Sequence, residues 1–131
     1  MTTILLVDDD PLEAHLLMAL LARQCGEVCR ATDVAEALCA VEQREFASKL
    51  SLVISGPQAK GIGGPAFVAE LRERMPELPV LVIGMANESQ RDYAVPDVTF
   101  LPFPAIPQQV ASAAGKLITQ STERMAKSRV A

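Results

Sequence analysis

Short apolar runs and longer amphipathic stretches alternate along the chain. Apolar runs without strict polar alternation are typical of strands buried on both faces of a parallel sheet. The predicted strands are residues 4–7, 27–31, 50–55, 79–84 and 98–101. Stretches with apolar residues every three or four positions predict helices at 11–24, 34–46, 65–75 and 106–118, with a short polar helix at 87–94.

This alternation predicts a doubly wound α/β domain, in which a parallel sheet carries helices on both faces. Right-handed crossovers between parallel strands place the helices there. The length of 131 residues is that of one domain. We assign residues 1–120 to this domain and residues 121–131, a polar segment, to a tail or linker.

Two of the predicted helices begin with capping signals. Asp10 stands directly before Pro11, which is a favourable N-cap and first-turn pair, and Asp33 with Glu36 matches a capping box. The first strand and first helix are therefore joined directly by a cap. The predicted apolar face of the first helix consists of Leu12, Leu16, Ala19 and Leu20.

The amino-acid composition of the chain argues against several classes of function. The net charge is −4 and aromatic residues are 4% with no Trp, so the domain lacks the basic face and stacking side chains that bind nucleic acid. The first apolar run is too short for a signal peptide, and no stretch reaches membrane-spanning length. We therefore predict a cytoplasmic domain that binds neither nucleic acid nor membrane. The 3 Cys residues are too few for a disulfide framework and are expected to be reduced.

Three carboxylates follow the first predicted strand directly. Open α/β sheets hold ligands at the edge where their strands end, which is where these residues lie. Asp8 and Asp9 are adjacent, and repulsion raises the pKa of one unless a cation, a proton or hydrogen-bond donors compensate. Asp10 is explained by the helix cap. Asp8 and Asp9 therefore predict a site, either working or vestigial.

The Gly-rich segment 56–64 predicts a loop and not a nucleotide site. It matches neither the Gly-x-Gly-x-x-Gly nor the Gly-Lys-Ser/Thr pattern of phosphate-binding loops. His15, the only His, stands in a helical pattern with no nucleophile arrangement around it. We therefore predict that the protein is not an enzyme, and a small α/β nucleotide-binding protein is a less favoured alternative.

Over residues 3–120 the chain resembles the receiver domains of two-component response regulators. The residues that carry the resemblance are 4–10, 52–64, 78–84 and 100–103. The resemblance implies a flavodoxin-like (βα)5 fold with a five-stranded sheet in the order 2-1-3-4-5. It also implies a phosphorylation site. An acidic pair there binds Mg²⁺, an Asp ending the third strand accepts the phosphoryl group, and a hydroxyl and a Lys hold the product.

The sequence departs from this pattern at most of the functional positions. Asp8 and Asp9 match the acidic pair, and no Asp or Glu occurs within residues 47–69 to act as acceptor. The phosphoacceptor, hydroxyl and Lys positions are occupied by Gly56, Gly84 and Leu101. We therefore predict a degenerate pseudo-receiver that needs no cofactor and binds Mg²⁺ at Asp8 and Asp9 weakly or not at all.

Such a domain is expected to act in signal transduction by phosphorylation-independent protein-protein interaction, with a protein partner, an output domain or a second copy. The resemblance places the interaction face on 87–94, the fifth strand and the last helix, with Tyr93, Phe100 and Phe103 as contact residues. It also implies a cis peptide bond before Pro102. An alternative is a receiver that is phosphorylated at a non-standard acceptor.

Overall fold

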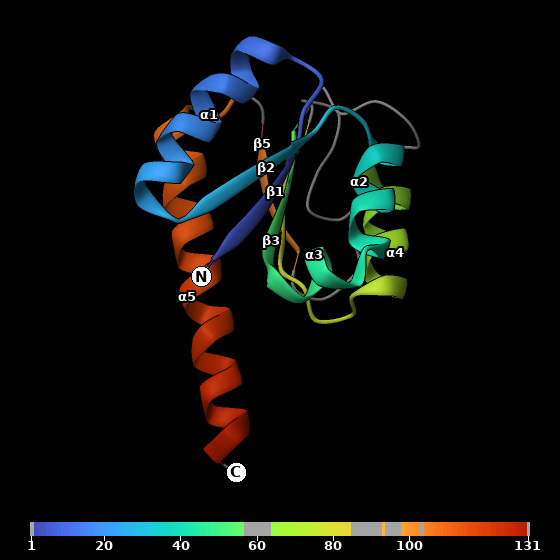
Figure 1. The fold of residues 1–131 in the computed structure, drawn as a ribbon. Helices are drawn as coiled ribbons and strands as arrows, with labels where there is room; N and C mark the ends of the chain where they lie inside the picture. Colours follow the sequence, from blue (N-terminus) through green and yellow to red (C-terminus); the bar gives the residue numbers. More distant parts are fainter. Residues whose placement is uncertain (1, 57–63, 85–92, 94–97, 103, 131) are drawn as a thin grey trace.

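The computed structural model describes residues 2–56, 64–84, 93, 98–102 and 104–130. The strands form one parallel sheet in the order β2-β1-β3-β4-β5, which confirms the predicted fold class (Figure 1). β1 and β4 are buried at every position, as their continuous apolar runs predict, whereas β2 lies half-buried at one edge. The strands are β1 (Thr3–Val7), β2 (Glu27–Ala31), β3 (Leu50–Ser55), β4 (Val80–Gly84) and β5 (Val98–Pro102).

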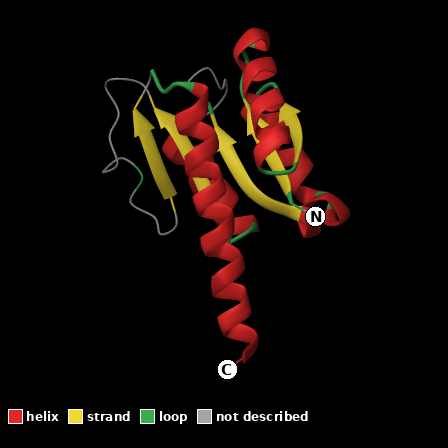
Figure 2. Cartoon of the chain, turned by 90° about the vertical axis from the view of Figure 1, so that its left-hand side faces the viewer, coloured by secondary structure: helices red, strands yellow, loops and turns green. Residues whose placement is uncertain are grey.

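Helices cover both faces of the sheet (Figures 1 and 2). One face carries α1 and α5, and the other carries α2, α3 and α4. Because side chains alternate along a strand, Ile4 and Leu6 of β1 join the core under α1 and α5, while Leu5 and Val7 join the core under α2 and α4. The helices are α1 (Pro11–Gln24), α2 (Val34–Glu42), α3 (Arg44–Lys49), α4 (Gly64–Arg74) and α5 (Pro107–Val130).

Both predicted N-caps are present. Asp10 Oδ1 accepts a hydrogen bond from the backbone N–H of Leu12 at 3.0 Å, and Asp33 Oδ1 accepts one from the backbone N–H of Glu36 at 2.8 Å. The Glu36 carboxylate accepts from Thr32 Oγ at 2.7 Å, one residue before the position expected in a capping box. The first cap fixes the direction of the chain directly after β1, where the predicted acidic site lies.

The structure buries a different apolar face of α1 from the predicted one. Leu12 and Leu16 are 69% and 52% exposed, Ala19 is exposed, and Leu20 is half-buried. The residues buried against the sheet are Ala14, Leu17 and Leu21. Apolar residues recur with helical spacing on two sides of this helix, so periodicity alone did not determine which side faces the sheet.

The predicted helix at 34–46 is two helices, α2 and α3. Gln43 between them has an extended backbone (φ −76°, ψ 110°), which ends α2. Phe46 of α3 packs, partly buried, against the same core as α2, so tertiary packing overrides helical continuity. The predicted short helix at 87–94 lies outside the described residues apart from Tyr93.

α5 continues through most of the predicted tail, as far as Val130 (Figure 2). Its 24 residues span about 36 Å at the rise of an α-helix, whereas the 5 residues of β1 span about 17 Å. The helix therefore extends well past the sheet. The domain boundary near residue 120 stays a prediction.

Two expectations from composition concern membranes and disulfides. Among the helices in the described part of the chain, none has the length and apolar character needed to cross a membrane. The thiols of Cys25, Cys29 and Cys39 are free.

Candidate functional site at the carboxyl edge of the sheet

The positions predicted from the sequence share one edge of the sheet. The last residues of β1 and β3 pair in register, so Asp8 and Gly56, which follow them, are neighbours. The backbone N–H of Gly56 donates to the carbonyl of Val7 at 2.8 Å. Gly84 at the end of β4 pairs with Pro102 of β5. The structure therefore brings together the strand ends that the resemblance identified.

Asp8 is a completely buried carboxyl group. Its Oδ1 accepts a hydrogen bond from the backbone N–H of Asp10 at 2.9 Å, and its Oδ2 has no hydrogen-bond partner among the described residues. Burial raises the pKa of Asp8. The Asp10 N–H and the charge of Arg30 oppose this rise, and the charges of Asp10 and Asp9 add to it. Repulsion from Asp9, the predicted cause, is thus the smallest of these effects, and desolvation is the largest.

Arg30 is a site residue that the sequence patterns missed. It lies in β2 and pairs in register with Leu6 of β1. Its Nε donates to the carbonyl of Asp8 at 3.1 Å and its Nη2 donates to the carbonyl of Asp9 at 3.3 Å. The guanidinium therefore fixes the backbone of the acidic pair and places a positive charge beside it. Its proximity to Asp8 becomes visible only with the strand order, because 22 residues separate the two in sequence.

Gly56 lies where a side chain would press directly on Asp8. A Cβ at this position would be 3.0 Å from Oδ2 of Asp8 and 3.1 Å from the carbonyl oxygen of Val7. These separations are shorter than ordinary carbon–oxygen contacts, so the Asp8 carboxyl group fills the space beside the Gly56 backbone. A side chain at position 56 would require Asp8 to move.

Asp8 and Asp9 are the carboxylates that would hold Mg²⁺ at this edge. Mg²⁺ prefers carboxylate and water oxygens in open octahedral geometry. Asp8 is fully enclosed, its pKa is raised by burial, and the nearby Arg30 already supplies positive charge. Within the part of the chain that the structure describes, no group of at least three His, Cys, Asp or Glu side chains is placed to hold a metal ion.

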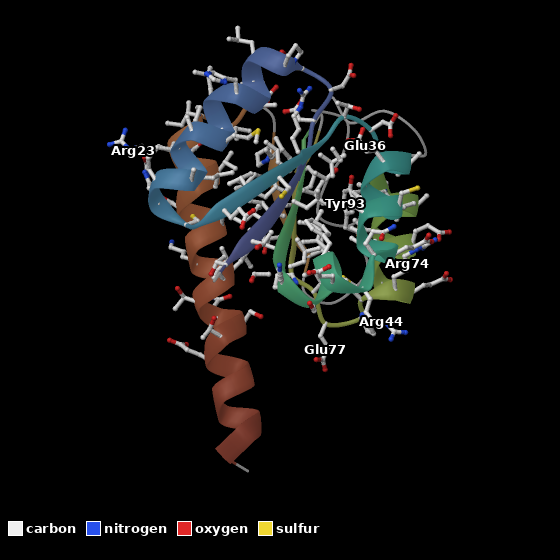
Figure 3. All side chains as sticks on the ribbon, in the orientation of Figure 1. Arg23, Glu36, Arg44, Arg74, Glu77 and Tyr93 are labelled. Atoms are coloured by element: carbon white, nitrogen blue, oxygen red, sulfur yellow. The ribbon has the colours of Figure 1, made fainter. Side chains whose placement is uncertain are left out.

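Tyr93 does not lie on the surface as predicted. It is only 4% exposed and belongs to the core under α2 and α4, and Figure 3 shows it between the sheet and these helices. Its ring stacks at a tilt on the half-buried ring of Phe100, with centroids 5.8 Å apart and an interplanar angle of 35°. Of the predicted contact residues, Tyr93 is therefore a core residue. Burying a large apolar ring is energetically more favourable than exposing it to water.

Leu101 and Pro102 lie at the end of β5. Leu101, at the position expected for Lys, is half-buried and packs against the core under α1 and α5. It presents an alkyl group and no charge to its surroundings. Phe103 lies outside the described residues. The cis peptide bond before Pro102 stays a prediction.

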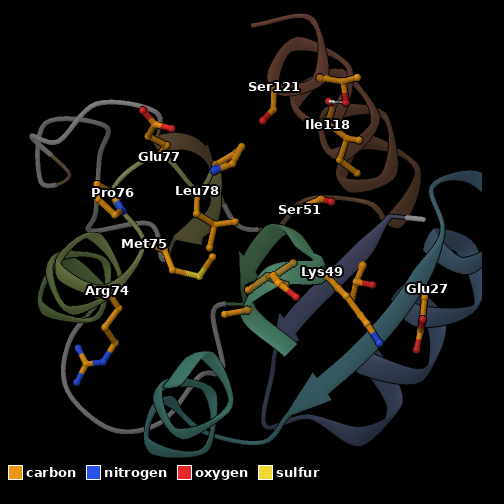
Figure 4. Close-up of a pocket in the computed structure, with 16 residues that line it drawn as sticks. Glu27, Lys49, Ser51, Arg74, Met75, Pro76, Glu77, Leu78, Ile118 and Ser121 are labelled. Carbon is orange, nitrogen blue, oxygen red and sulfur yellow. Dashed lines mark hydrogen bonds between the residues drawn. The ribbon is translucent and has the colours of Figure 1, made fainter. Parts of the chain in front are cut away.

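A concavity lies near the opposite, amino edge of the sheet. Its volume is about 930 Å³, and α3, the segment after α4 and the middle of α5 form its walls (Figure 4). Met75, Leu78 and Ile118 contribute apolar surface, and Lys49 and Glu77 contribute opposite charges. The sequence patterns gave no sign of this concavity, because it depends on connections and on the continuation of α5. It contains none of the predicted site residues.

The chain is similar in sequence and in fold to known proteins. The profile of a family described as the response regulator receiver domain matches residues 4–97. The receiver domain of the hybrid histidine kinase CckA is 30% identical, with a TM-score of 0.72 over 88% of this chain and 98% of that chain. No curated protein gives a significant match.

More distant solved structures share the fold. A response regulator receiver domain protein from Clostridium thermocellum is 18% identical, with a TM-score of 0.77 over 95% of this chain and 97% of that chain. A structure described as an adenylate cyclase from Rhodopirellula baltica is 22% identical, with a TM-score of 0.81 over 98% of this chain and 95% of that chain. Identity at this level shows likeness of fold, not of activity.

Proposed function

Because the chain belongs to the family of response regulator receiver domains, we propose that it is a pseudo-receiver that acts in two-component signalling without phosphorylation. Receiver domains are generally non-enzymatic signalling modules that interact with other proteins or output domains. The observation that carries the proposal is Gly56: beside Asp8, where the resemblance expects the acceptor carboxylate, the chain has no side chain.

The positions around Gly56 support the loss of the acceptor. The residue before it, Ser55, is only 5% exposed in β3, and residues 47–69 contain no Asp or Glu. A Ser hydroxyl is also a weak nucleophile that needs an adjacent general base. Phosphorylation at a non-standard acceptor is therefore the alternative that the test must detect.

The surroundings of Asp8 support independence from Mg²⁺. Transfer of a phosphoryl group in this family relies on a metal ion that neutralises the phosphoryl oxygens. The Asp8 carboxyl group is buried, and the Arg30 guanidinium beside it supplies positive charge from the protein itself. We therefore expect neither acetyl phosphate nor Mg²⁺ to change the structure.

Acetyl phosphate and beryllofluoride, each with Mg²⁺, test this proposal on the native chain. We expect no phosphorylated species in the intact mass spectrum and no change in backbone amide NMR shifts with beryllofluoride. A receiver with an intact acidic site, assayed beside it, gives the positive response. A phosphorylated species, or shifts that cluster at the carboxyl edge, would contradict the proposal.

We place the protein interaction on the β5 and α5 side of the domain, where the resemblance expects it. β5 is an edge strand of the sheet, and Ile106, directly before α5, is 62% exposed. Tyr93 is buried, so the contact is assigned to Ile106 and the exposed Pro102 and Pro104. A large exposed apolar side chain with Pro residues beside it favours a preformed surface.

Photo-crosslinking from two exposed apolar positions tests this placement. A photoreactive amino acid at Ile106 should capture a partner or a second copy, whereas the same group at Leu16 on α1, which is 52% exposed, should capture little. Sedimentation velocity then distinguishes self-association from a foreign partner. Capture from Leu16 and not from Ile106 would move the interface to α1.

A further inference from the structure

The aromatic pair Tyr93 and Phe100 occupies space that two glycines leave free. The rings are 5.8 Å apart and pack against the core that contains Phe67 and Val68 of α4. One ring comes from β5 and the other from the chain before it. The pair therefore lies between the end of the sheet and α4, and not on the outer surface.

Gly84 accommodates the ring of Phe100. Phe100 pairs in register with Val82, so Gly84, two residues further along β4, faces the same side of the sheet. A Cβ built on Gly84 would overlap Cε2 and Cζ of the Phe100 ring. Any side chain at position 84 therefore requires the ring to leave its place.

Gly64 accommodates the hydroxyl of Tyr93 in the same way. Gly64 is the first residue of α4, and a Cβ built on it would overlap Oη of Tyr93. Gly115 in α5 provides a contrast, because a Cβ there would meet nothing within 4 Å. The two glycines thus match the two rings, whereas Gly115 has open space around it.

We propose that Tyr93 and Phe100 form a fixed aromatic plug that holds the ends of β4, β5 and α4 in one arrangement. The inference rests on the proposed function. The resemblance expects at position 84 the hydroxyl that senses phosphorylation, whereas here Gly84 leaves that space to the Phe100 ring. Interdigitated rings resist gradual displacement, since close-packed groups shift only between discrete arrangements. The β4 and β5 ends therefore do not respond to events at Asp8.

Matched glycine substitutions test the steric part of the plug. Gly84→Ala and Gly115→Ala add the same methyl group, one against Phe100 and one in open space. We expect Gly84→Ala to lower Tm by about 5–10 °C through overpacking. Gly115→Ala should raise Tm slightly, because Ala favours a helix interior over Gly. Equal Tm changes in the two variants would overturn the plug.

Tyr93 is itself a spectroscopic probe, because the chain has 1 Tyr and no Trp. Acrylamide should quench its fluorescence weakly in the native chain and severalfold more in Gly84→Ala, where Phe100 is displaced. In Gly115→Ala, acrylamide should quench the Tyr93 fluorescence as weakly as in the native chain. Unchanged quenching in a folded Gly84→Ala variant would show that the ring yields without disturbing Tyr93, and would overturn the plug.

A double variant keeps the proposal testable where Gly84→Ala does not fold. The three heavy atoms nearest to a Cβ on Gly84 all belong to the Phe100 ring, so Gly84→Ala should lower the Tm of Phe100→Ala much less than that of the native chain. The two substitutions should therefore be strongly non-additive. Additive effects would overturn the plug while leaving the proposed function untouched.

Beryllofluoride with Mg²⁺ separates failure of the plug from failure of the proposed function. With the native chain we expect no change in Tyr93 quenching or in Tm. A change in Tyr93 quenching would overturn both the fixed plug and phosphorylation independence. A null result here, together with additive glycine and Phe100 substitutions, would overturn the plug alone.

Discussion

The two halves of the carboxyl edge are built from opposite kinds of side chain. Around β1, β2 and β3 the edge is polar, with the buried Asp8 carboxyl group, the Arg30 guanidinium and no side chain at Gly56. Around β4 and β5 the edge is aromatic, with Phe100 over Gly84. In a phosphoryl-transfer site both halves contact the same group, so they must carry complementary polar groups.

Because of this difference, we expect the two halves to affect different properties of the chain. The aromatic half is continuous with the core under α2 and α4, so its side chains contribute mainly to stability. The polar half has the charged groups of Asp8 and Arg30 beside Gly56, so we expect its side chains mainly to determine how stability depends on cations and pH. Substitutions in the first half should change stability most, and those in the second should change how stability depends on conditions.

The largest effect is expected from removing a ring of the aromatic half. Tyr93→Ala should lower the free energy of unfolding by about 3–5 kcal/mol, because it leaves a cavity where a buried ring packs. Urea denaturation measures this change. Tyr93→Phe keeps the ring and should have a much smaller effect. Similar losses in both variants would attribute the stability to the hydroxyl and not to ring packing.

The next effect concerns position 56 in the polar half. Gly56→Asp should lower the free energy of unfolding by about 3 kcal/mol in the absence of metal, because it places an uncompensated carboxylate against buried Asp8. Mg²⁺ at millimolar concentration should restore much of this loss by supplying the missing charge. Thermal unfolding with and without Mg²⁺ measures both changes.

Gly56→Ala is the matched control for this prediction. It adds the same Cβ beside Oδ2 of Asp8 without the charge. It should be destabilised by crowding, and Mg²⁺ should not restore its Tm. A Mg²⁺ response of the native chain as large as that of Gly56→Asp would show that the polar half already binds the metal.

The sequence predicted the strands well and the site incompletely, and the two halves show why. The strands themselves follow from the apolar runs. Their order and the neighbourhood of Asp8 and Gly56 follow from the family pattern, and the structure agrees. Arg30 was missed because its contact with the acidic pair depends on which strands are neighbours, and local patterns carry no such information.

Side-chain burial was harder to predict than strand order. Tyr93 stands in a polar stretch that predicts an exposed position, but packing on Phe100 and in the core under α2 and α4 buries it. Helix α1 has apolar residues on two sides, so its sequence permits either side to be buried. The side that contains Leu17 and Leu21 is buried because it packs on the sheet. In both cases the tertiary contact decides between alternatives that the local sequence permits equally.

A smaller effect is expected from the cation of the polar half. Arg30→Met removes two charge-assisted hydrogen bonds to backbone carbonyls while keeping an apolar chain of similar length. It should lower the free energy of unfolding by about 1–2 kcal/mol. Arg23→Met is the control, because Arg23 is exposed on α1 and extends away from the fold (Figure 3). Equal changes in the free energy of unfolding of the two variants would show that the contacts of Arg30 do not stabilise the site.

The smallest effect is a dependence of stability on pH that originates at Asp8. Burial raises the pKa of this carboxyl group in the folded state above its ordinary value of 3.8, so folding favours the protonated form. Its stabilising contribution is therefore complete below the unfolded pKa and is lost as the pH rises through the folded pKa. Asp8→Asn is uncharged at every pH and keeps an oxygen that accepts from the Asp10 N–H.

Asp8→Asn should accordingly unfold at a higher temperature than the native chain at neutral pH, and the difference should shrink as the pH falls toward 4. Asp33→Asn is a suitable control, because Asn caps a helix about as well as Asp and the Asp33 carboxylate is not among the groups that shift the pKa of Asp8. Thermal unfolding of all three proteins across this pH range measures the effect. If the native chain were instead the more stable at neutral pH, Asp8 would be held as a compensated carboxylate. The polar half would then contain a stronger cation site than its described residues provide.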